Sequence, residues 1–158
     1  MKKLFAIIGL SLLFSCGGDK PANEGEAQGE YETNEPASEV PKSVAEGKGV
    51  GEVKSVEMTS PLDKDRIARG KAVYDMKCQA CHRLDNQRVV GPGWKDLTKK
   101  RKPEWIMNMI TNVDMMLEQD PEAQKLLEEC LTRMPNQNVS VGDARDILEF
   151  MRQNDGEI

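Results

Sequence analysis

One short run, Cys78-Gln79-Ala80-Cys81-His82, constrains the fold of this 158-residue chain more than any other feature, and it holds the only histidine. Cysteines three positions apart on a helical turn point to the same side, and the adjacent histidine can turn its ring under that side. A thioredoxin-like cysteine pair would follow a strand, but residues 65–76 are predicted to be helical. A structural zinc site would need a second ligand pair, and only Cys130 remains downstream.

The run matches the pattern for covalent attachment of one haem. Thioether bonds to Cys78 and Cys81 would hold the porphyrin, and His82 would be the proximal iron ligand. Four cysteines and one histidine placed at random would rarely produce this arrangement, so we predict haem c as the single cofactor. Such attachment takes place outside the cytoplasm, where a free cysteine pair would otherwise tend to form a disulfide.

Elimination reduces the number of candidates for the second axial ligand of the haem iron. Because His82 is the only histidine, the distal position is left to methionine, lysine, cysteine, a small ligand or nothing. We predict Met134, because it ends the predicted helix 122–133 and precedes a proline in a polar loop. Met115 or Met116 is the alternative, although both suit gap-filling positions in or just after the preceding helix.

Residues 63–158 resemble a class I c-type cytochrome domain, a small all-α fold around one haem. Gly70 and Tyr74 lie where that family has a glycine and an aromatic residue on its first helix, for close crossing with the last helix. Ile147 and Phe150 suit the partner positions on the last helix. The resemblance therefore implies a close contact between the first and last helices of the domain.

Two residue pairs extend the resemblance to the haem pocket. Gly91-Pro92 resembles the family's Gly-Pro loop, whose proline carbonyl accepts the hydrogen bond from the proximal histidine. Met134-Pro135 resembles the Met-Pro of the distal loop, where the thioether binds iron from the other face. Trp94 follows the first pair, and its indole either donates to a haem propionate or only packs in the pocket.

Capping patterns place the helices of the domain. A helix over residues 63–77 has acidic residues at its start, and a helix over 103–111 has proline in its first turn. Asp120-Pro121 begins a third helix, and Ser140-Val141-Gly142-Asp143 begins the last. Because no stretch of useful length alternates with period two, we predict an all-α fold.

The start of the chain is typical of an export signal. Lys2 and Lys3 precede an apolar run over residues 4–14, which is too short to span a membrane. The run leads into Leu13-Phe14-Ser15-Cys16, which resembles the bacterial lipoprotein box. We predict a lipoprotein signal peptide over residues 1–15 and lipid attachment at Cys16. An ordinary cleaved signal with an incidental cysteine is the alternative.

Residues 17–62 contain ten acidic residues, seven glycines and four prolines, but only one aromatic residue. Such a stretch cannot bury enough apolar surface to offset its conformational entropy. We therefore predict that residues 16–62 form a lipidated, acidic, disordered tether and that residues 63–158 form the haem domain. The chain would then be exported and anchored to a bacterial membrane by its lipid, with the haem domain in the periplasm.

Charge is unevenly distributed along the predicted domain. Residues 63–103 hold twelve Lys or Arg against five Asp or Glu, whereas residues 104–158 hold four against twelve. The Cys78-to-His82 segment, here called the haem run, is flanked by Lys77, Arg83 and Arg88. A basic rim there would steer the domain toward redox proteins with an acidic docking surface. We expect no nucleic-acid partner for an exported chain with a net charge of −5.

These observations predict a membrane-tethered electron carrier that moves single electrons and has no small-molecule substrate. By analogy, its donor would be a quinol-oxidising complex and its acceptor a terminal oxidase or an exported reductase. One alternative is a haem-containing subunit of a larger redox complex. Another is a haem enzyme or gas sensor with an open distal site, which the lack of a distal histidine argues against.

Cys130, one helical turn before Met134, is left over from these assignments. It could form an intermolecular disulfide or serve as an alternative thiolate ligand. We favour the simpler interpretation, a small buried residue on the apolar stripe of its helix, because free cysteine is among the residues most often buried.

Overall fold

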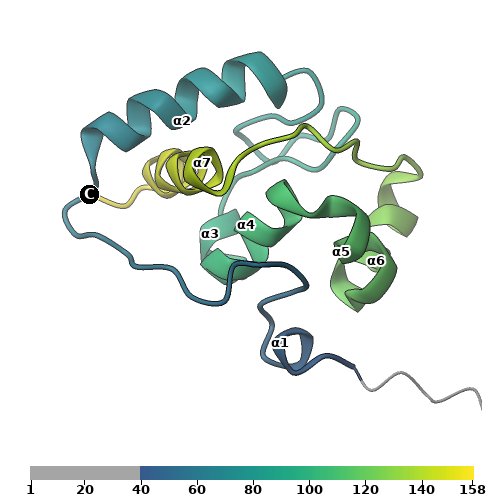
Figure 1. Ribbon diagram of the computed structural model, residues 1–158. Helices are drawn as coiled ribbons and strands as arrows, with labels where there is room; N and C mark the ends of the chain where they lie inside the picture. Colours follow the sequence, from purple (N-terminus) through teal and green to yellow (C-terminus); the bar gives the residue numbers. More distant parts are fainter. Residues whose placement is uncertain (1–39) are drawn as a thin grey trace, which may run out of the picture. The chain divides into compact units, whose positions relative to one another are not determined.

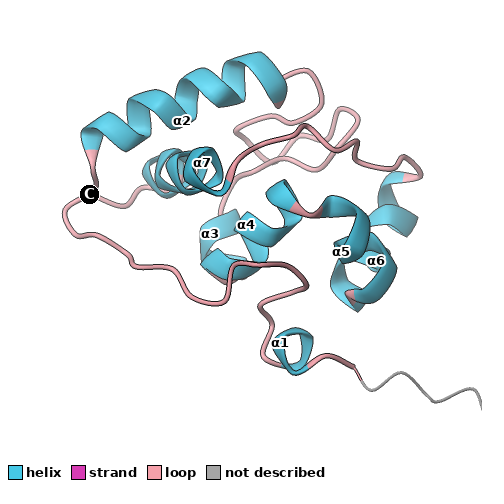
Figure 2. Ribbon diagram, in the orientation of Figure 1, coloured by secondary structure: helices cyan, strands magenta, loops and turns pink. Residues whose placement is uncertain are grey.

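The structure is a computed structural model, and it describes residues 40–158, which lie within one compact unit, Pro36–Ile158. Figures 1 and 2 show that this part of the chain consists of helices joined by loops, without a strand, so the all-α prediction is confirmed. The predicted signal peptide and Cys16 lie outside the described residues. The helices are α1 (Lys42–Ala45), α2 (Lys64–Lys77), α3 (Leu97–Lys100), α4 (Pro103–Thr111), α5 (Val113–Gln119), α6 (Pro121–Cys130) and α7 (Val141–Asn154).

The main helix packing is the crossing of α2 with α7 (Figure 1). Helix α7 begins at its predicted cap, Ser140, whereas Asp63, expected only as an acidic residue in the first turn, proves to be the cap of α2; both side chains accept hydrogen bonds from backbone N–H groups of the first turn. At the crossing, Gly70 is buried directly against the backbone of Asp146 and Ile147. A side chain at this position would push the helices apart, so the close crossing depends on glycine.

Helices α4, α5 and α6 supply most of the remaining core residues. Helix α4 has the bounds predicted from sequence, but α5 was not predicted as a separate helix. Helix α6 ends at Cys130 rather than at residue 133, because Leu131 adopts the left-handed conformation (φ 55°) that commonly ends a helix. Met134 therefore lies in a loop, as expected, but four positions after the last residue of α6 and not directly after it.

Residues 40–62, here called the strap, were expected to be part of the tether but instead pack on the domain. Val53 of the strap is buried in the core. Asn108 of α4, a residue that is only 1% exposed, binds the strap backbone through hydrogen bonds. The Asn108 Oδ1 accepts a hydrogen bond from the Val53 N–H (3.1 Å), and its Nδ2 donates to the carbonyls of Lys48 and Val53 (3.0 Å each). These bonds satisfy strap backbone groups that lose contact with water on packing.

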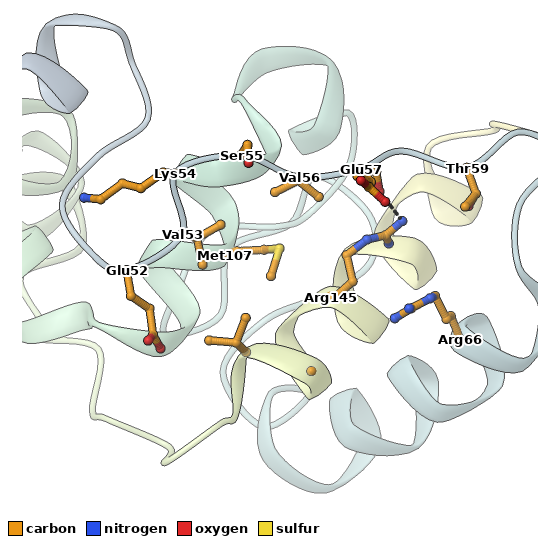
Figure 3. A pocket seen from close by; sticks show the side chains of 12 residues that line it. Glu52, Val53, Lys54, Ser55, Val56, Glu57, Thr59, Arg66, Met107 and Arg145 are labelled. Carbon is orange, nitrogen blue, oxygen red and sulfur yellow. Dashed lines mark hydrogen bonds between the residues drawn. The ribbon is translucent and has the colours of Figure 1, made fainter.

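The strap also lies across α7. Strap residues 52–59 pass above α7 (Figure 3). Residues of the strap and of α7 line an open cleft of about 710 Å³. Arg145 of α7 lines the cleft and donates a hydrogen bond to the Glu57 carbonyl (3.0 Å). Arg152, further along α7, donates to the Thr59 carbonyl (3.0 Å). The strap is therefore held by side chains of two helices, α4 and α7.

Glu149 of α7 joins the strap, α2 and α7 at one buried carboxylate. Its Oε1 accepts hydrogen bonds from the Thr59 hydroxyl (2.9 Å) and the Asp63 N–H (3.1 Å), and Oε2 is paired with Arg145 and Arg152. Burial alone would raise the pKa of Glu149, but the hydrogen bonds from Arg145, Asp63 and Thr59 outweigh it and lower the pKa to about 2. The ionised form is thus strongly preferred in the folded protein.

Replacing Gly70 should separate α2 from α7. In Gly70→Ala, the added Cβ would lie about 2.5 Å from the Asp146 carbonyl carbon and 2.9 Å from the Ile147 nitrogen, so the free energy of unfolding should fall by at least about 2 kcal/mol. The matched control is Gly142→Ala in α7, where the nearest atom is Ser140 Oγ at 3.7 Å and the change should stay within about 1 kcal/mol. Guanidinium unfolding of both holoproteins, followed by circular dichroism, would measure this, and equal stabilities would contradict it.

The stability of the protein should also depend on the Glu149 carboxylate. Because folding lowers its pKa from 4.5 to about 2, its contribution is full above pH 4.5 and is lost as the pH falls toward 2. The shift corresponds to roughly 3 kcal/mol. We expect Glu149→Gln to be less stable than wild type at pH 7 and the gap to narrow between pH 4.5 and 2. Urea unfolding across this range would test it, and a gap independent of pH would show that ionisation is not the cause.

Candidate haem site

An apolar cavity of about 380 Å³ lies between the loop that follows the haem run and helices α4 to α6. Its size falls in the range of small-molecule and cofactor sites. Cys81 and His82 line one side, and Cys130 and Met134 belong to the segment that lines another. The structure therefore brings the predicted proximal and distal residues to the same cavity, although they are far apart in the sequence.

His82 is held in one orientation by its backbone and its ring. Its Nδ1 lies 2.8 Å from the Pro92 carbonyl oxygen, and because a carbonyl can only accept, Nδ1 carries the proton and Nε2 keeps its lone pair. Burial lowers the pKa of His82, and the Pro92 contact only partly opposes this shift, so the ring is neutral at pH 7. A neutral imidazole with Nε2 unprotonated is the form that binds a metal.

Gly91 allows the Pro92 contact to form. A Cβ at position 91 would collide with the His82 ring, lying 2.8 Å from Nδ1 and closer still to Cε1. The Gly91 N–H also donates to the Cys81 carbonyl (3.0 Å), which returns the loop to the haem run. The glycine is thus required by a close approach between backbone and ring, which explains the Gly-Pro pair noted in the sequence.

Cys78 and Cys81 lie at the end of α2 and in the turn that follows. Cys78 caps the helix with its N–H bonded to the Tyr74 carbonyl, and its own carbonyl accepts from the N–H groups of Cys81 (3.1 Å) and His82 (2.9 Å). Burial raises the pKa of the Cys78 thiol to about 11. The tight turn keeps both cysteines and the histidine within one helical turn of each other, as the spacing predicted.

Tyr74 and Trp94 support His82 from behind. The Tyr74 hydroxyl donates to the His82 carbonyl (2.8 Å), and the ring centroids of Tyr74 and Trp94 lie 4.9 Å apart. Trp94 also contacts the His82 ring (5.5 Å) and lines the cavity, while Phe150 of α7 packs on Tyr74 (5.5 Å). The four rings connect the α2–α7 crossing to the cavity. Whether Trp94 also contacts a haem propionate stays a prediction.

The two alternative methionines lie away from the cavity lining. Met116 is fully buried beneath the strap, where its sulfur accepts a hydrogen bond from the Val50 N–H (3.0 Å), and Met115 is exposed. Met134 is partly buried and lines the cavity. The arrangement favours Met134 over Met115 and Met116 as the methionine that faces a cofactor.

Sequence reasoning missed part of the cavity wall. Met109 and Met151 both line it, although they were expected only to fill gaps in the core, and Cys130 lines it as well. Met109 follows Trp105 by four positions on α4, so the two share a helix face, and this spacing could have identified it. Met151 could not be placed without knowing how α7 crosses the core.

The residues present fit a haem. The cavity has an apolar lining, a neutral imidazole with a free Nε2, two cysteines beside it and a thioether in the facing segment. Among the described residues, no cluster of three or more His, Cys, Asp or Glu side chains could hold a metal ion without such a group. The site is therefore built for an apolar, planar cofactor that brings most of its own metal ligands.

The chain belongs to the cytochrome c family, which matches residues 67–155. Its fold and structural neighbours place it among the class I monohaem c-type cytochromes, and it binds one covalent haem c. No curated protein matches the chain.

The chain is similar to solved structures of cytochrome c from Rhodothermus marinus. It is 36% identical to that protein with a TM-score of 0.67, and the match covers 73% of this chain and 97% of that chain. An engineered form, Rma TDE, is 35% identical with a TM-score of 0.66 and the same coverage. The same engineered cytochrome, bound to the carbene intermediate 1-ethoxy-1-oxopropan-2-ylidene, is 34% identical, again with the same coverage, and has a TM-score of 0.63.

Proposed function

We propose that this cytochrome c is a dedicated carrier of single electrons, with His82 and Met134 as the axial ligands and Cys78 and Cys81 as the attachment points of its haem. The observation that carries this proposal is the placement of His82 and Met134 on one apolar cavity. Bound haem c supplies an iron that changes between the ferric and ferrous states.

The chain's own residues prepare the site for electron transfer. Pro92 keeps His82 oriented and its Nε2 unprotonated, so the ligand does not have to reorganise. Apolar residues from α4 to α6 form much of the cavity lining. Ligation by methionine and histidine gives a higher reduction potential than two histidines would. A pre-oriented histidine beside an apolar lining suits repeated electron transfer without substrate chemistry.

An enzymatic role would need a reactive distal face. The chain has no second histidine that could act on a distal ligand. The distal segment contributes Cys130, Thr132 and Arg133 to the cavity, and most of the other lining residues are apolar. The carbene-bound relative is an engineered protein, so the carbene intermediate is a property of that protein. We therefore propose that this chain does not act as a haem enzyme or gas sensor.

We further propose that the carrier is exported and held at a bacterial membrane by a lipid on Cys16, with the haem domain in the periplasm. Among the described residues, no helix is both long and apolar enough to cross a bilayer. The lipid on Cys16 would supply the attachment. Because the strap is part of the domain, the tether would be residues 17–39, with a taut reach of about 80 Å. A tether raises the effective concentration of partners at the same membrane.

Redox proteins with acidic docking surfaces are the proposed partners. Lys77, Arg83 and Arg88 are exposed beside the haem run, and their charge would accelerate association at low ionic strength. By analogy, the donor would be a quinol-oxidising complex and the acceptor a terminal oxidase or an exported reductase. A fixed place as one subunit of a larger redox complex is the alternative, and co-purification would separate the two.

Met134→Ala should remove the proposed sixth ligand of the haem iron and leave the distal coordination position open. Ferric wild type should show the weak long-wavelength charge-transfer band of methionine ligation, and the variant should lose it. Reduced wild type should resist carbon monoxide, whereas the variant should bind it at once. The matched control is Met109→Ala, which removes a cavity-lining methionine from α4 and should keep the band. A band that survives in Met134→Ala, or rapid carbon monoxide binding by wild type, would contradict the assignment.

Cys16→Ser should release the protein from the membrane. Wild type expressed in a bacterium that processes lipoproteins should sediment with membranes and give an N-terminal peptide whose mass includes acyl chains. The variant should instead appear in the soluble exported fraction with its haem attached. Membrane association that persists in Cys16→Ser, or an unmodified N-terminus in wild type, would show that lipid is not the anchor.

A further inference from the structure

The segment that carries Met134 has few attachments to the rest of the domain. In residues 132–139, here called the distal loop, no backbone group pairs with another backbone group of the described chain. Val139 is buried and Met134 partly so, but most of the loop is exposed. Its position therefore depends on side chains that reach it from other elements.

Two basic residues reach this region from the haem-attachment side. Lys77, the last residue of α2, donates from Nζ to the carbonyl oxygen of Gln137 in the distal loop (2.9 Å). Arg88, in the loop between His82 and Pro92, donates from Nη1 to the Glu129 carbonyl (2.8 Å), and its Nη2 lies 3.5 Å from the Glu129 carboxylate. Both contacts are exposed to solvent.

The two contacts lie on either side of Met134 in the sequence. Gln137 follows Met134 by three positions, and Glu129, near the end of α6, precedes it by five. Lys77 adjoins Cys78, and Arg88 forms a β-bridge with His82. The Lys77 side chain thus joins the haem-attachment side to the distal loop itself, and the Arg88 side chain joins it to the end of α6, from which the distal loop leads on. Arg133 adds a third tie, to Asp114 of α5 (2.9 Å), which does not involve the attachment side.

We propose that Lys77 and Arg88 form a latch that keeps Met134 at the haem, and that an acidic partner surface opens the latch by binding these two side chains. Carboxylates of a docked protein would compete with the Gln137 carbonyl for Lys77 and with Glu129 for Arg88. Docking would then loosen the distal ligand. The inference rests on the proposed function, because it requires Met134 to be that ligand.

Lys77→Ala/Arg88→Ala should weaken the hold on Met134 without opening the site permanently. In the ferric holoprotein, imidazole competes with Met134, so its dissociation constant should fall by about threefold to tenfold, as expected for two exposed contacts. Trypsin should also cut after Arg133 faster by a similar factor, a readout that does not depend on haem chemistry. Lys77→Arg/Arg88→Lys keeps both donors and should restore wild-type values.

The matched control is Lys71→Ala/Lys99→Ala, which removes the same charge from two exposed lysines. Their partners, Asp75 and Asp96, lie within one helical turn, so neither contact reaches the distal loop. This variant should bind imidazole as wild type does. If it changes as much as the Lys77/Arg88 variant, net charge and not the latch is the cause, and the proposal fails.

Polyglutamate provides an acidic surface of known chemistry. At low ionic strength it should lower the imidazole dissociation constant of wild type and of the Lys71/Lys99 control, but not of the Lys77/Arg88 variant. An equal response in all three proteins would overturn the role of docking.

The proposed ligand and the proposed latch can fail separately. Wild type without the methionine charge-transfer band would refute Met134 ligation. A normal band with unchanged imidazole binding and trypsin cleavage in the Lys77/Arg88 variant would refute only the latch.

Discussion

A single hydrogen bond, from His82 Nδ1 to the Pro92 carbonyl, sets the direction of the only imidazole in the chain. The bond forms because Gly91 has no side chain to displace the ring. Tyr74 holds the His82 backbone from behind through its hydroxyl, so the residue is fixed at both ring and carbonyl. The loop after the haem run, the end of α2 and the aromatic core are all arranged around that one orientation.

The helical scaffold supports this site through contacts that also bring in the strap. The α2–α7 crossing at Gly70 positions Tyr74, and the buried Glu149 carboxylate ties the start of α2 to the strap and α7. A buried carboxylate is tolerated only when its hydrogen bonds and charge are matched, and Arg145 and Arg152 supply that match. The strap thus belongs to the folding unit of the haem domain, although it lies outside the family match.

Features encoded over a few neighbouring residues were predictable from sequence, whereas features made by distant contacts were not. The haem run, the cap at Ser140 and the Gly91-Pro92 pair each act over one or two turns. The strap looked like a tether because its composition is acidic and rich in glycine, and its packing depends on Asn108, more than fifty positions away. The end of α6 depends on the left-handed Leu131, for which no glycine gave a signal.

The two sides of the cavity are built differently, and this difference has a consequence for the cofactor. On the His82 side, backbone hydrogen bonds and packed rings fix the ligand within one continuous segment. On the Met134 side, the loop has no backbone pairing within the described chain and is held by solvent-exposed side chains. Exposed ties contribute little individually and weaken with salt. If His82 and Met134 are the axial ligands, as proposed, a change of ligand would therefore begin at Met134, whereas His82 would stay in place.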